Sequence, residues 1–583
     1  MVTTIRLRGR SRFQPRTSAH SGARSAARAL RYELITMKVV KPKSQVSSWA
    51  PFAHISFVVL WTATVISNVG TWMHDVASGW LMTSLSPSPL MVALVQAATT
   101  LPVFLFALPA GAIADLVDRR RLLIVVMAIL AISTLLLGML VLFEQISAWT
   151  LLAFTFISGA GAAFVAPAWQ AIVPQLVPRD ALQPAVTLNS VGINISRAIG
   201  PALAGIIIVS AGIAWPYLLN ALSFVVVIVA LLWWRPPPKK VSHLAAERFW
   251  TAMGAGLRYA RSSGPLRSTL IRAVAFFLFA SAYWSLLPLI ARQELGGGPE
   301  LYGIMLGAVG LGAVGGALLL QKLKGHLGAD ALVATGTVGT ALVLIVFALF
   351  KQSAVAIVAS FVAGASWIAV LSSLNVSAQV ALPDWVRARG LSIFITVFFG
   401  AMTLGSILWG QAASMLGISI TLQMAAAGAL IGAFISWPAK LQLGMDLDLS
   451  PSSHWPEPIV SGEIEPDRGP VLVTVEYRID LKSRAVFITL MNELKTMRKR
   501  NGAYSWGLFE DVAEPGRYLE YFTEDSWVGH LRHHERVSVS DRDIQKRVLA
   551  LHVGDSAPLV THFLAPEPNV APVSAPVQSE QIG

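Results

Sequence analysis

The stretch Gly111-Ala-Ile-Ala-Asp-Leu-Val-Asp-Arg-Arg-Arg121 joins two long apolar runs and combines two acids with three consecutive arginines. Asp115 falls where a helix ends, and a carboxylate is disfavoured there unless a cation meets it, because the helix macrodipole is negative at that end. Arginines clustered in a short loop between apolar runs are typical of the cytoplasmic side of a membrane protein. The stretch therefore predicts a charged helix–loop–helix junction at the inner face of a bilayer.

The composition favours a membrane protein over a soluble one. The 583-residue chain is 54% hydrophobic and only 13% charged, which is far more apolar than a soluble globular average. Its net charge of +13 would suit a nucleic acid, but the basic residues are spread over an N-terminal tail, short loops and a C-terminal region. We therefore expect the lipid bilayer as a partner and no nucleic acid. The absence of cysteine excludes disulfides and thiolate metal sites.

Apolar runs of about 20 residues, the length that crosses a bilayer, recur between Phe52 and Trp437. The loops placed inside carry most of the Arg and Lys, and those placed outside carry little beyond Arg292 and Lys351. This asymmetry predicts that both termini are cytoplasmic. The twelve expected spans are 54–82, 89–115, 120–143, 149–177, 184–211, 215–235, 268–292, 299–323, 330–350, 354–382, 388–416 and 418–437.

The spans predict an all-α membrane protein made of two six-helix halves, with a small soluble domain after them. The halves cover residues 52–235 and 268–437, with a cytoplasmic loop at 236–267 between them. Residues 1–45 are basic, acid-poor and without a sustained apolar face, so we expect a disordered tail, although an organelle transit peptide has a similar composition. A linker at 440–470, an α+β domain at 471–565 and a second disordered tail at 566–583 complete the expected order.

Two stretches narrow the family. FVAPAWQAIVPQLVPRD at 164–180 and NSVGINISRAIGPALAG at 189–205 resemble the transmembrane secretion effector branch of the major facilitator superfamily. This branch includes enterobactin-type siderophore exporters and macrolide-type drug exporters. The resemblance implies a twelve-helix bundle with 6+6 pseudo-repeats, embedded as a multi-pass protein in the bacterial inner membrane. It also implies secondary active export of a siderophore, drug or secondary metabolite by alternating access, with protons as the coupling ion, and neither enzymatic activity nor a cofactor.

The resemblance also assigns roles to two motifs. The 111–121 loop is similar to the superfamily's gating loop, with Asp118 in place of its usual second glycine; Asp115 would meet the N-terminus of the eleventh span near Arg389 when the cytoplasmic side closes. Residues 196–205 are similar to the fifth-helix motif of proton antiporters, in which Gly200 and Gly205 allow close helix approach and Pro201 permits a bend. A purely structural kink is the alternative. The expected gating residues are Gly111, Asp115, Asp118, Arg119, Arg120 and Arg121.

Ionisable side chains inside a span are costly and mark candidate functional sites. Arg197 could contact an anionic or polar substrate or bias a proton-binding carboxylate, or it could be held by backbone carbonyls between helices. Asp75 could carry the coupling proton, or it could be a water-exposed acid near the outer end of its helix. Other polar residues could line a cavity, although each alone more often bonds a neighbouring helix: Asn68, Gln96, Gln170, Asn194, Asn375 and Gln379.

The C-terminal domain reads as strand, helix, strand, strand and helix, the order of a ferredoxin-like unit. Strands are expected at 471–480, 503–510 and 517–523, and a helix at 484–499. Residues 518–527, with His530, His533 and His534 after them, resemble a cofactor-free monooxygenase-like domain. The domain could dimerise or regulate the bundle, or the chain could be a membrane-tethered oxygenase. His530 and His534 would share a helix face, but the glutamate usual between such a pair is missing, so we expect no metal.

Overall fold

The computed structural model describes residues 47–236, 249–323, 327–383, 385–441, 467–554 and 556–566, with isolated linker positions 452, 460, 464 and 465. The predicted tail 1–45, nearly all of the tail 566–583 and most of the predicted linker lie outside the described residues. The side chain of Asp115 lies outside them as well, as do the side chains of residues 112, 116, 249–255, 321–323 and 535.

Twelve helices that are long and apolar enough to cross a membrane make up the bundle in the described part of the chain. The N-terminal half holds α2 (Ile55–Leu85), α3 (Pro89–Leu116), α4 (Arg119–Leu142), α5 (Ala148–Leu176), α6 (Leu182–Ala211) and α7 (Trp215–Trp233). The C-terminal half holds α9 (Gly264–Leu289), α10 (Pro299–Leu323), α11 (Ala329–Leu349), α12 (Ser353–Val380), α13 (Arg387–Leu416) and α14 (Ile418–Ile435). The predicted fold class is confirmed, and each helix begins and ends within a few residues of its predicted span.

Short elements complete the bundle. The 3₁₀ turns η1 (Ala50–Ala53) and η2 (Arg179–Ala181) precede α2 and α6, and α9 runs on into a π-helical turn, η3 (Ile290–Glu294). Many helix faces expose large apolar side chains; Val209 and Phe434, for example, are 63% and 82% exposed. An apolar exterior is what a bilayer requires, since lipid solvates apolar side chains while the backbone bonds stay inside each helix.

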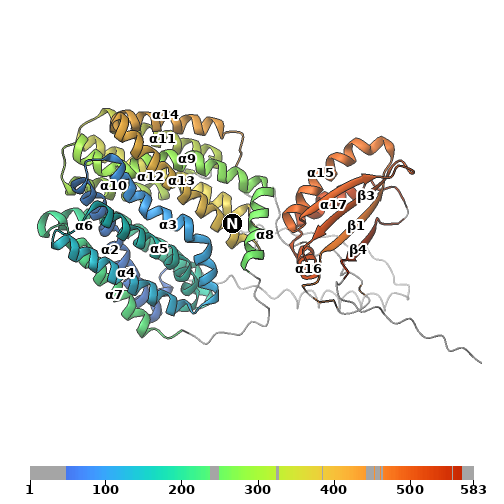
Figure 1. Ribbon diagram of the computed structural model, residues 1–583, viewed down its shortest axis with the longest axis horizontal. Helices are drawn as coiled ribbons and strands as arrows, with labels where there is room; N and C mark the ends of the chain where they lie inside the picture. The colour runs from blue at the N-terminus through green and yellow to red at the C-terminus, as the bar shows by residue number, and fades with distance from the viewer. Residues whose placement is uncertain are drawn as a thin grey trace, which may run out of the picture.

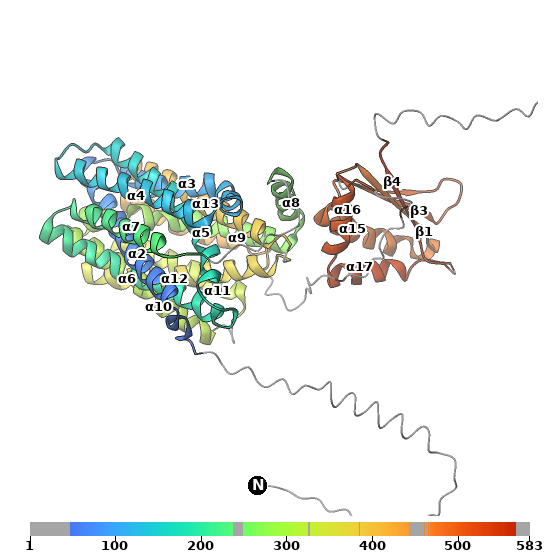
Figure 2. The same ribbon diagram turned by 90° about the horizontal axis from the view of Figure 1, so that it is seen from below.

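The two halves meet along two helix pairs. α3 packs along α13, and α6 packs along α10. In Figure 1 the blue-to-teal half and the green-to-orange half lie side by side, and the C-terminal domain sits beyond one end of the bundle. Figure 2 shows the same arrangement from below. Because the chain reverses after each helix, the N-terminus of α2, the 116–119 loop and the C-terminus of α14 all lie at this end.

The predicted loop at 236–267 contains a helix that the sequence analysis missed, α8 (Phe249–Ser262). It packs against α13 of the bundle and against α15 of the C-terminal domain. Its 14 residues are too few to cross a bilayer, so a search for long apolar runs passes over it. We call the end of the bundle that carries this helix the α8 end.

The C-terminal domain is a four-stranded antiparallel sheet with helices packed on it. Its elements are β1 (Val471–Arg478), α15 (Arg484–Asn501), β2 (Ser505–Glu510), β3 (Arg517–Glu524), α16 (Trp527–Arg536), α17 (Val539–Leu549) and β4 (Leu559–Leu564); a 3₁₀ turn, η4 (Leu481–Ser483), leads into α15. The strand order β2-β3-β1-β4 is the one that the predicted ferredoxin-like βαββαβ connection produces. The single helix expected after β3 is in fact two helices, because Ser538 starts α17 with a capping box that it forms with Asp541.

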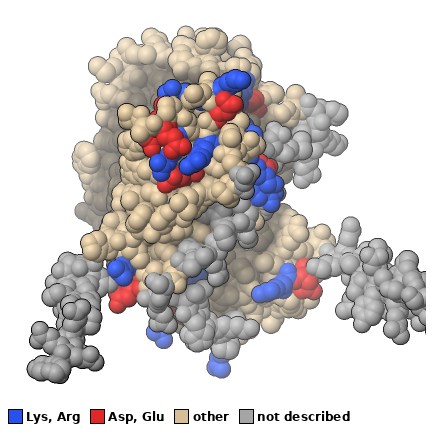
Figure 3. Space-filling view, turned by 90° about the vertical axis from the view of Figure 1, so that its right-hand side faces the viewer, with Lys and Arg blue, Asp and Glu red and all other residues tan. Residues whose placement is uncertain are grey.

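Alternate residues of β1 face the helices, so Val471, Val473, Val475 and Tyr477 are buried. They pack with Phe487, Met491 and Leu494 of α15 and its neighbours to form the domain core. The outer surface differs from that of the bundle. In Figure 3, which faces the C-terminal domain, basic and acidic side chains lie next to each other in front of the mostly tan bundle, in line with exposed pairs such as Arg517–Glu476 at 2.9 Å.

Candidate functional site

Arg197 lies midway along α6 and turns toward the seam between the halves. Its guanidinium carbon sits 5.5 Å from the ring centre of Trp72 on α2. Its Nε is buried, and no described residue hydrogen-bonds it. Arg197 also interacts electrostatically with Tyr283 on α9, whose hydroxyl is likewise buried without a described partner. A cation from one half and a phenol from the other therefore lie within electrostatic range of each other in the middle of the bundle. This arrangement argues against the alternative in which backbone carbonyls hold the guanidinium at Nε.

Tyr283 is the first of five aromatic side chains in the C-terminal half that contact one another in succession. The sequence analysis did not predict this cluster. The Tyr283 ring is 5.5 Å from that of Trp284, which is 5.3 Å from Trp367 on α12. Trp367 lies 5.2 Å from Phe277, and Phe277 lies 4.4 Å from Phe398 on α13. The adjacent pairs Phe276-Phe277 and Tyr283-Trp284 are visible in the sequence, but aromatic pairs are common in membrane helices. Only the fold brings α9, α12 and α13 together.

Asp75 is half-buried on α2, ten residues before the helix ends away from α8. It interacts electrostatically with Tyr217 of α7 and Tyr302 of α10. The neighbouring His74 is 2% exposed, packs edge-on against Tyr217 at 5.0 Å, and has no described hydrogen-bond partner on either ring nitrogen. Asp75 therefore lies near two buried tyrosines. This position disfavours the alternative that Asp75 is a water-exposed acid.

The other predicted cavity residues do not form one cluster with Asp75. Asn68 and Asn194 lie at the depth of Arg197, but the Asn194 amide donates to the carbonyl of Ser190 on its own helix at 2.8 Å. Gln96 is half-buried toward the end of α3 that lies away from α8. Gln170, Asn375 and Gln379 are exposed near the α8 end, where the Gln379 amide donates to Asn375 at 3.2 Å.

The 111–121 loop is held by its own polar groups and by bonds to the end of α7. The Asp118 carboxylate caps α4 by accepting from the Arg121 amide at 2.8 Å. Arg120 donates from Nε to the Leu231 carbonyl at 2.7 Å and from Nη2 to the Leu232 carbonyl at 2.8 Å, which ties α4 to the end of α7. Arg119 donates to the Ala114 carbonyl at 3.3 Å. A Cβ added at Gly111 would meet nothing within 4 Å, and the gating contact of Asp115 stays a prediction.

The glycine–proline motif of α6 lies at the seam. A Cβ on Gly200 would come within 2.6 Å of Trp72 on α2, and one on Gly205 would come within 2.9 Å of the α10 backbone at Pro299 and Glu300. Pro201 is buried inside the helix between them. Substitution at Gly200 would push α6 off α2 within the N-terminal half, whereas substitution at Gly205 would push α6 off α10, so Gly205 sets how closely the halves approach here.

Hydrogen bonds join the halves away from the α8 end. Arg292 donates from Nη1 to the hydroxyls of Thr83 at 2.8 Å and Ser84 at 2.5 Å. The Leu90 amide donates to the Ser414 hydroxyl at 3.1 Å. Nearer the middle, the Thr100 and Thr403 hydroxyls share a hydrogen bond of 2.7 Å. These contacts join α2 to the η3 turn that follows α9, and α3 to α13.

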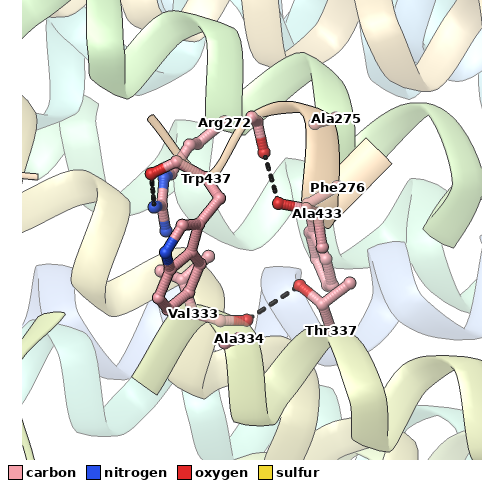
Figure 4. Close-up of a pocket in the computed structure, with 9 residues that line it drawn as sticks. Arg272, Ala275, Phe276, Val333, Ala334, Thr337, Ala433 and Trp437 are labelled. Carbon is pink, nitrogen blue, oxygen red and sulfur yellow. Dashed lines mark hydrogen bonds between the residues drawn. The ribbon is translucent and has the colours of Figure 1, made fainter. Parts of the chain in front are cut away.

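Another arginine, Arg272, lies within α9, inside the predicted span 268–292. Arg272 is 3% exposed, pairs with Asp330 of α11 at 3.0 Å and donates to the Ala439 and Trp437 carbonyls after α14. Figure 4 shows it stacked beside the Trp437 ring in a small crevice between α9, α11 and α14. The ion pair locks three helices at the α8 end, which is a structural role.

The C-terminal domain buries two polar clusters. In the first, the Glu520 carboxylate accepts from Arg498 at 3.0 Å, from Trp506 at 3.0 Å and from the Tyr477 hydroxyl at 2.9 Å. In the second, Glu524 accepts from the Nδ1 atoms of His530, at 2.7 Å, and His533. His534 of α16 and His562 of β4 border this second cluster, with their rings next to that of His530.

Burial and neighbouring charges shift the pKa values of the second cluster. Burial alone would raise the pKa of Glu524, but the imidazoles of His533 and His530 more than offset it and lower that pKa to about 2. Burial, helped by the nearby His530, lowers the pKa of His534 to about 3. The same two causes lower the pKa of His562. At neutral pH Glu524 is therefore an anion, while His534 and His562 are uncharged.

The domain touches the bundle through α16 and α15. Arg258 of α8 lies 3.9 Å from Asp525, just before α16, and the Arg536 guanidinium lies 4.3 Å from the ring centre of Trp385, just before α13. α15 packs against α8. The helix that carries His530 and His534 is thus also a docking helix.

The family model of the transmembrane secretion effectors matches residues 46–569, which is most of the chain. The chain belongs to this family. The resemblance read from residues 164–180 and 189–205 is therefore confirmed for the transporter. The monooxygenase-like resemblance of the C-terminal domain stays a prediction.

This secretion effector is similar to several curated transporters. The staphyloferrin A transporter of Staphylococcus aureus is 24% identical over 60% of this chain and 87% of its own. The multidrug efflux pump Tap of Mycolicibacterium fortuitum is 25% identical over 62% of this chain and 89% of its own. The enterobactin exporter EntS of Salmonella typhimurium is 24% identical over 55% of this chain and 76% of its own.

Solved transporters share the fold of this secretion effector. The nucleoside transporter NupG superposes with a TM-score of 0.57 at 12% identity and covers 66% of this chain and 99% of its own. An inward-facing bacterial homologue of the human lysosomal transporter Spinster superposes with a TM-score of 0.51 at 14% identity, over 66% of this chain and 95% of its own. At such identities the likeness establishes the fold and no more.

Proposed function

We propose that this secretion effector exports a small siderophore, drug or secondary metabolite across the bacterial inner membrane by alternating access, in exchange for protons. The relatives named for staphyloferrin A, enterobactin and drugs support this class of cargo. The observation that carries the proposal is the position of Arg197 midway along α6, with an Nε that no described residue hydrogen-bonds and within electrostatic range of Tyr283 of the other half. A buried charge in mid-membrane is costly, and its place between two halves that can move suits a group that a substrate contacts in turn from either side.

The chemistry of the site indicates an amphipathic cargo. A guanidinium forms paired hydrogen bonds with carboxylates and other planar oxygen anions. The partly exposed rings of Trp284 and Phe398, which pack on Trp367 and extend from Tyr283, offer apolar and aromatic surface in the C-terminal half. A molecule with an anionic or polar group and an aromatic or apolar body satisfies both surfaces.

The orientation follows from the basic loops. The α8 end carries the Arg119–Arg121 run, Arg179, Arg387 and Arg389, so it is the cytoplasmic end under the positive-inside rule. Both termini and the C-terminal domain then lie in the cytoplasm, where the domain serves as a regulatory or dimerising module docked on α8. The bonds of Arg292 and Leu90 close the outer end.

The gate would act at the inner end. Asp115 would meet the positive N-terminus of α13 when that end closes, a contact worth about 0.3–2 kcal/mol, which is enough to bias nearly balanced conformers. Asp115→Asn is expected to reduce efflux while leaving expression intact, and Asp180→Asn in the next basic loop is its control. Normal efflux from Asp115→Asn would remove this gate.

Asp75 would carry the coupling proton, and proton coupling is tested in proteoliposomes. Collapsing ΔpH should stop net export by the wild type. Asp75→Asn should lose export driven by ΔpH yet keep substrate exchange at equal concentrations, whereas Glu144→Gln should behave as wild type. Export that is unchanged after ΔpH collapse rules out the proton.

The transport proposal itself is tested by comparing extracellular metabolites of cells with and without the chain. A compound that disappears from the medium when the gene is removed, and accumulates inside, is the cargo. Removing residues 451–583 separates export from the oxygenase alternative. An exporter retains some efflux of the unmodified compound, whereas a tethered oxygenase loses all activity.

A further inference from the structure

Three histidines of the C-terminal domain converge from two elements. His530 and His534 lie one turn apart on α16, and His562 lies on β4. The β4 register pairs His562 with Val473, a buried residue of β1, so His562 faces the helices rather than the open side of the sheet. One ring nitrogen from each histidine lies within 4.8 Å of the other two.

The spacing suits a shared ion. The Nε2 atoms of His530 and His534 are 3.2 Å apart. Two nitrogens bound to one tetrahedral Zn²⁺ at 2.0–2.1 Å lie about 3.3 Å apart. The pair on α16 is therefore already at ligand spacing, and a His562 ring nitrogen lies within 4.8 Å of both.

Glu524 prepares His530 for this role. Its carboxylate accepts from Nδ1 of His530 at 2.7 Å, which places the imidazole proton on Nδ1 and leaves the lone pair of Nε2 directed at the cluster. A carboxylate behind a ligating imidazole orients the ring and raises its basicity, as in many zinc sites. Glu524 of β3 is thus an outer-shell carboxylate, a role different from that of the general-base glutamate missing between His530 and His534.

We propose that His530, His534 and His562 bind a divalent transition-metal ion, Zn²⁺ above all, with water in the remaining position. Three imidazoles with no thiolate suit Zn²⁺, and Cu²⁺ and Ni²⁺ are the competing ions. His534 and His562 are only half-buried, so ion and water can enter, while His530 is 1% exposed and fixed by Glu524. Trp527 lies 5.5 Å from the His530 ring and shields one side.

The ion would link a strand to the docking helix. With two ligands on α16 and one on β4, it would fix α16 against the sheet. The same helix meets the bundle through Arg536 on Trp385, and Asp525 just before it pairs with Arg258. A bound metal is therefore expected to stiffen the contact between the C-terminal domain and the α8 end. This inference is independent of the transport proposal, because binding is measured without substrate.

A plain hydrogen bond is the competing account. If Nε2 of His534 carries a proton and donates to Nε2 of His530, the 3.2 Å separation needs no ion. The cluster would then be a polar core network, and metal would bind weakly or elsewhere.

The test is a Co²⁺ and Zn²⁺ titration of the full chain in detergent, purified on a tag without histidines and stripped with EDTA. One equivalent of Co²⁺ is expected to give the visible absorption of a tetrahedral complex, and Zn²⁺ should displace it. His534→Gln and His562→Gln should each abolish this signal, and Glu524→Gln should weaken binding by about 10–100-fold. His552→Gln is the matched control, because His552 lies at the far end of β1, where its Nδ1 accepts from Arg478.

If a variant misfolds, X-ray absorption of the wild-type zinc complex still tests the proposal, because it needs no substitution. Three imidazole nitrogens and one oxygen around the metal are expected. The proposal is overturned by any one of three results: no binding at micromolar Co²⁺, unchanged affinity in His534→Gln and His562→Gln, or a coordination shell made mainly of oxygen.

Discussion

Arg197 combines features that a structural arginine does not need. It stacks on Trp72 in its own half and faces Tyr283 of the other half, while its Nε has no described partner. Arg272, the other arginine buried in the bundle, shows the contrast, since Asp330 and two carbonyls satisfy it. Arg272 thus has an anionic partner and two carbonyl acceptors within its own half, whereas the Nε of Arg197 has no described acceptor.

This difference predicts the effect of replacing Arg197. Arg197→Gln removes a charged donor from the substrate and should weaken substrate binding by roughly 10–100-fold, since a charge-assisted hydrogen bond contributes about 1.5–3 kcal/mol. The chain should still fold, because the Arg197 Nε bonds no described group. Binding of the exported compound to purified protein measures the change, with the exposed Arg179→Gln as control. Equal binding by Arg197→Gln and wild type would contradict the role.

Glu520 of the C-terminal domain, like Arg272 of the bundle, has a structural role. It is fully buried and neutralises Arg498, whose side chain is 6% exposed. Glu520→Gln removes the carboxylate that accepts from this buried guanidinium and should cost about 3–5 kcal/mol. Glu493→Gln breaks an exposed pair with Arg547 and should cost less than about 1 kcal/mol. Hydrogen exchange of β1 and α15 in the full chain measures both, and equal protection in the two variants would contradict the difference.

Among the elements, α8 and α16 decide how the C-terminal domain meets the bundle. The Arg258–Asp525 pair is largely exposed and long at 3.9 Å, so it contributes little. The Arg536 guanidinium carbon lies 4.3 Å from the ring centre of Trp385, well within cation–π range, and such contacts contribute about 0.5–2 kcal/mol. The connection that carries Trp385 leads directly into α13, one of the helices at the seam.

This ranking predicts that Trp385→Ala loosens the docked domain while Asp525→Asn leaves it nearly unchanged. Faster hydrogen exchange in α8 and α16 of Trp385→Ala, measured in the full chain, would report the loss. If exchange were faster in Asp525→Asn than in Trp385→Ala, the ion pair and not the stacking contact would hold the domain.

At the scale of the whole molecule, patterns that lie within one segment could be read from the sequence. Each bundle helix is one apolar run, so its existence and ends followed from length alone. The α8 helix did not, because its 14 residues lack that length. Interactions between residues far apart in the chain could not be predicted either. No sequence pattern indicates that Arg272 lies near Asp330, or Tyr283 near Arg197. His530 and His534 show their one-turn spacing in the sequence, but His562 reaches them only through the pairing of β4 with β1.

The central claim, that the site beside Arg197 opens to each side of the membrane in turn, is tested by labelling single cysteines, since the natural chain has none. Asn194→Cys lies one helical turn before Arg197, midway along α6, and Arg121→Cys marks the α8 end. A membrane-impermeant thiol reagent is applied to right-side-out and to inside-out vesicles. The account predicts that Asn194→Cys reacts from both sides, whereas Arg121→Cys reacts only in inside-out vesicles. Reaction of Asn194→Cys from one side alone, or of Arg121→Cys from outside, would contradict it.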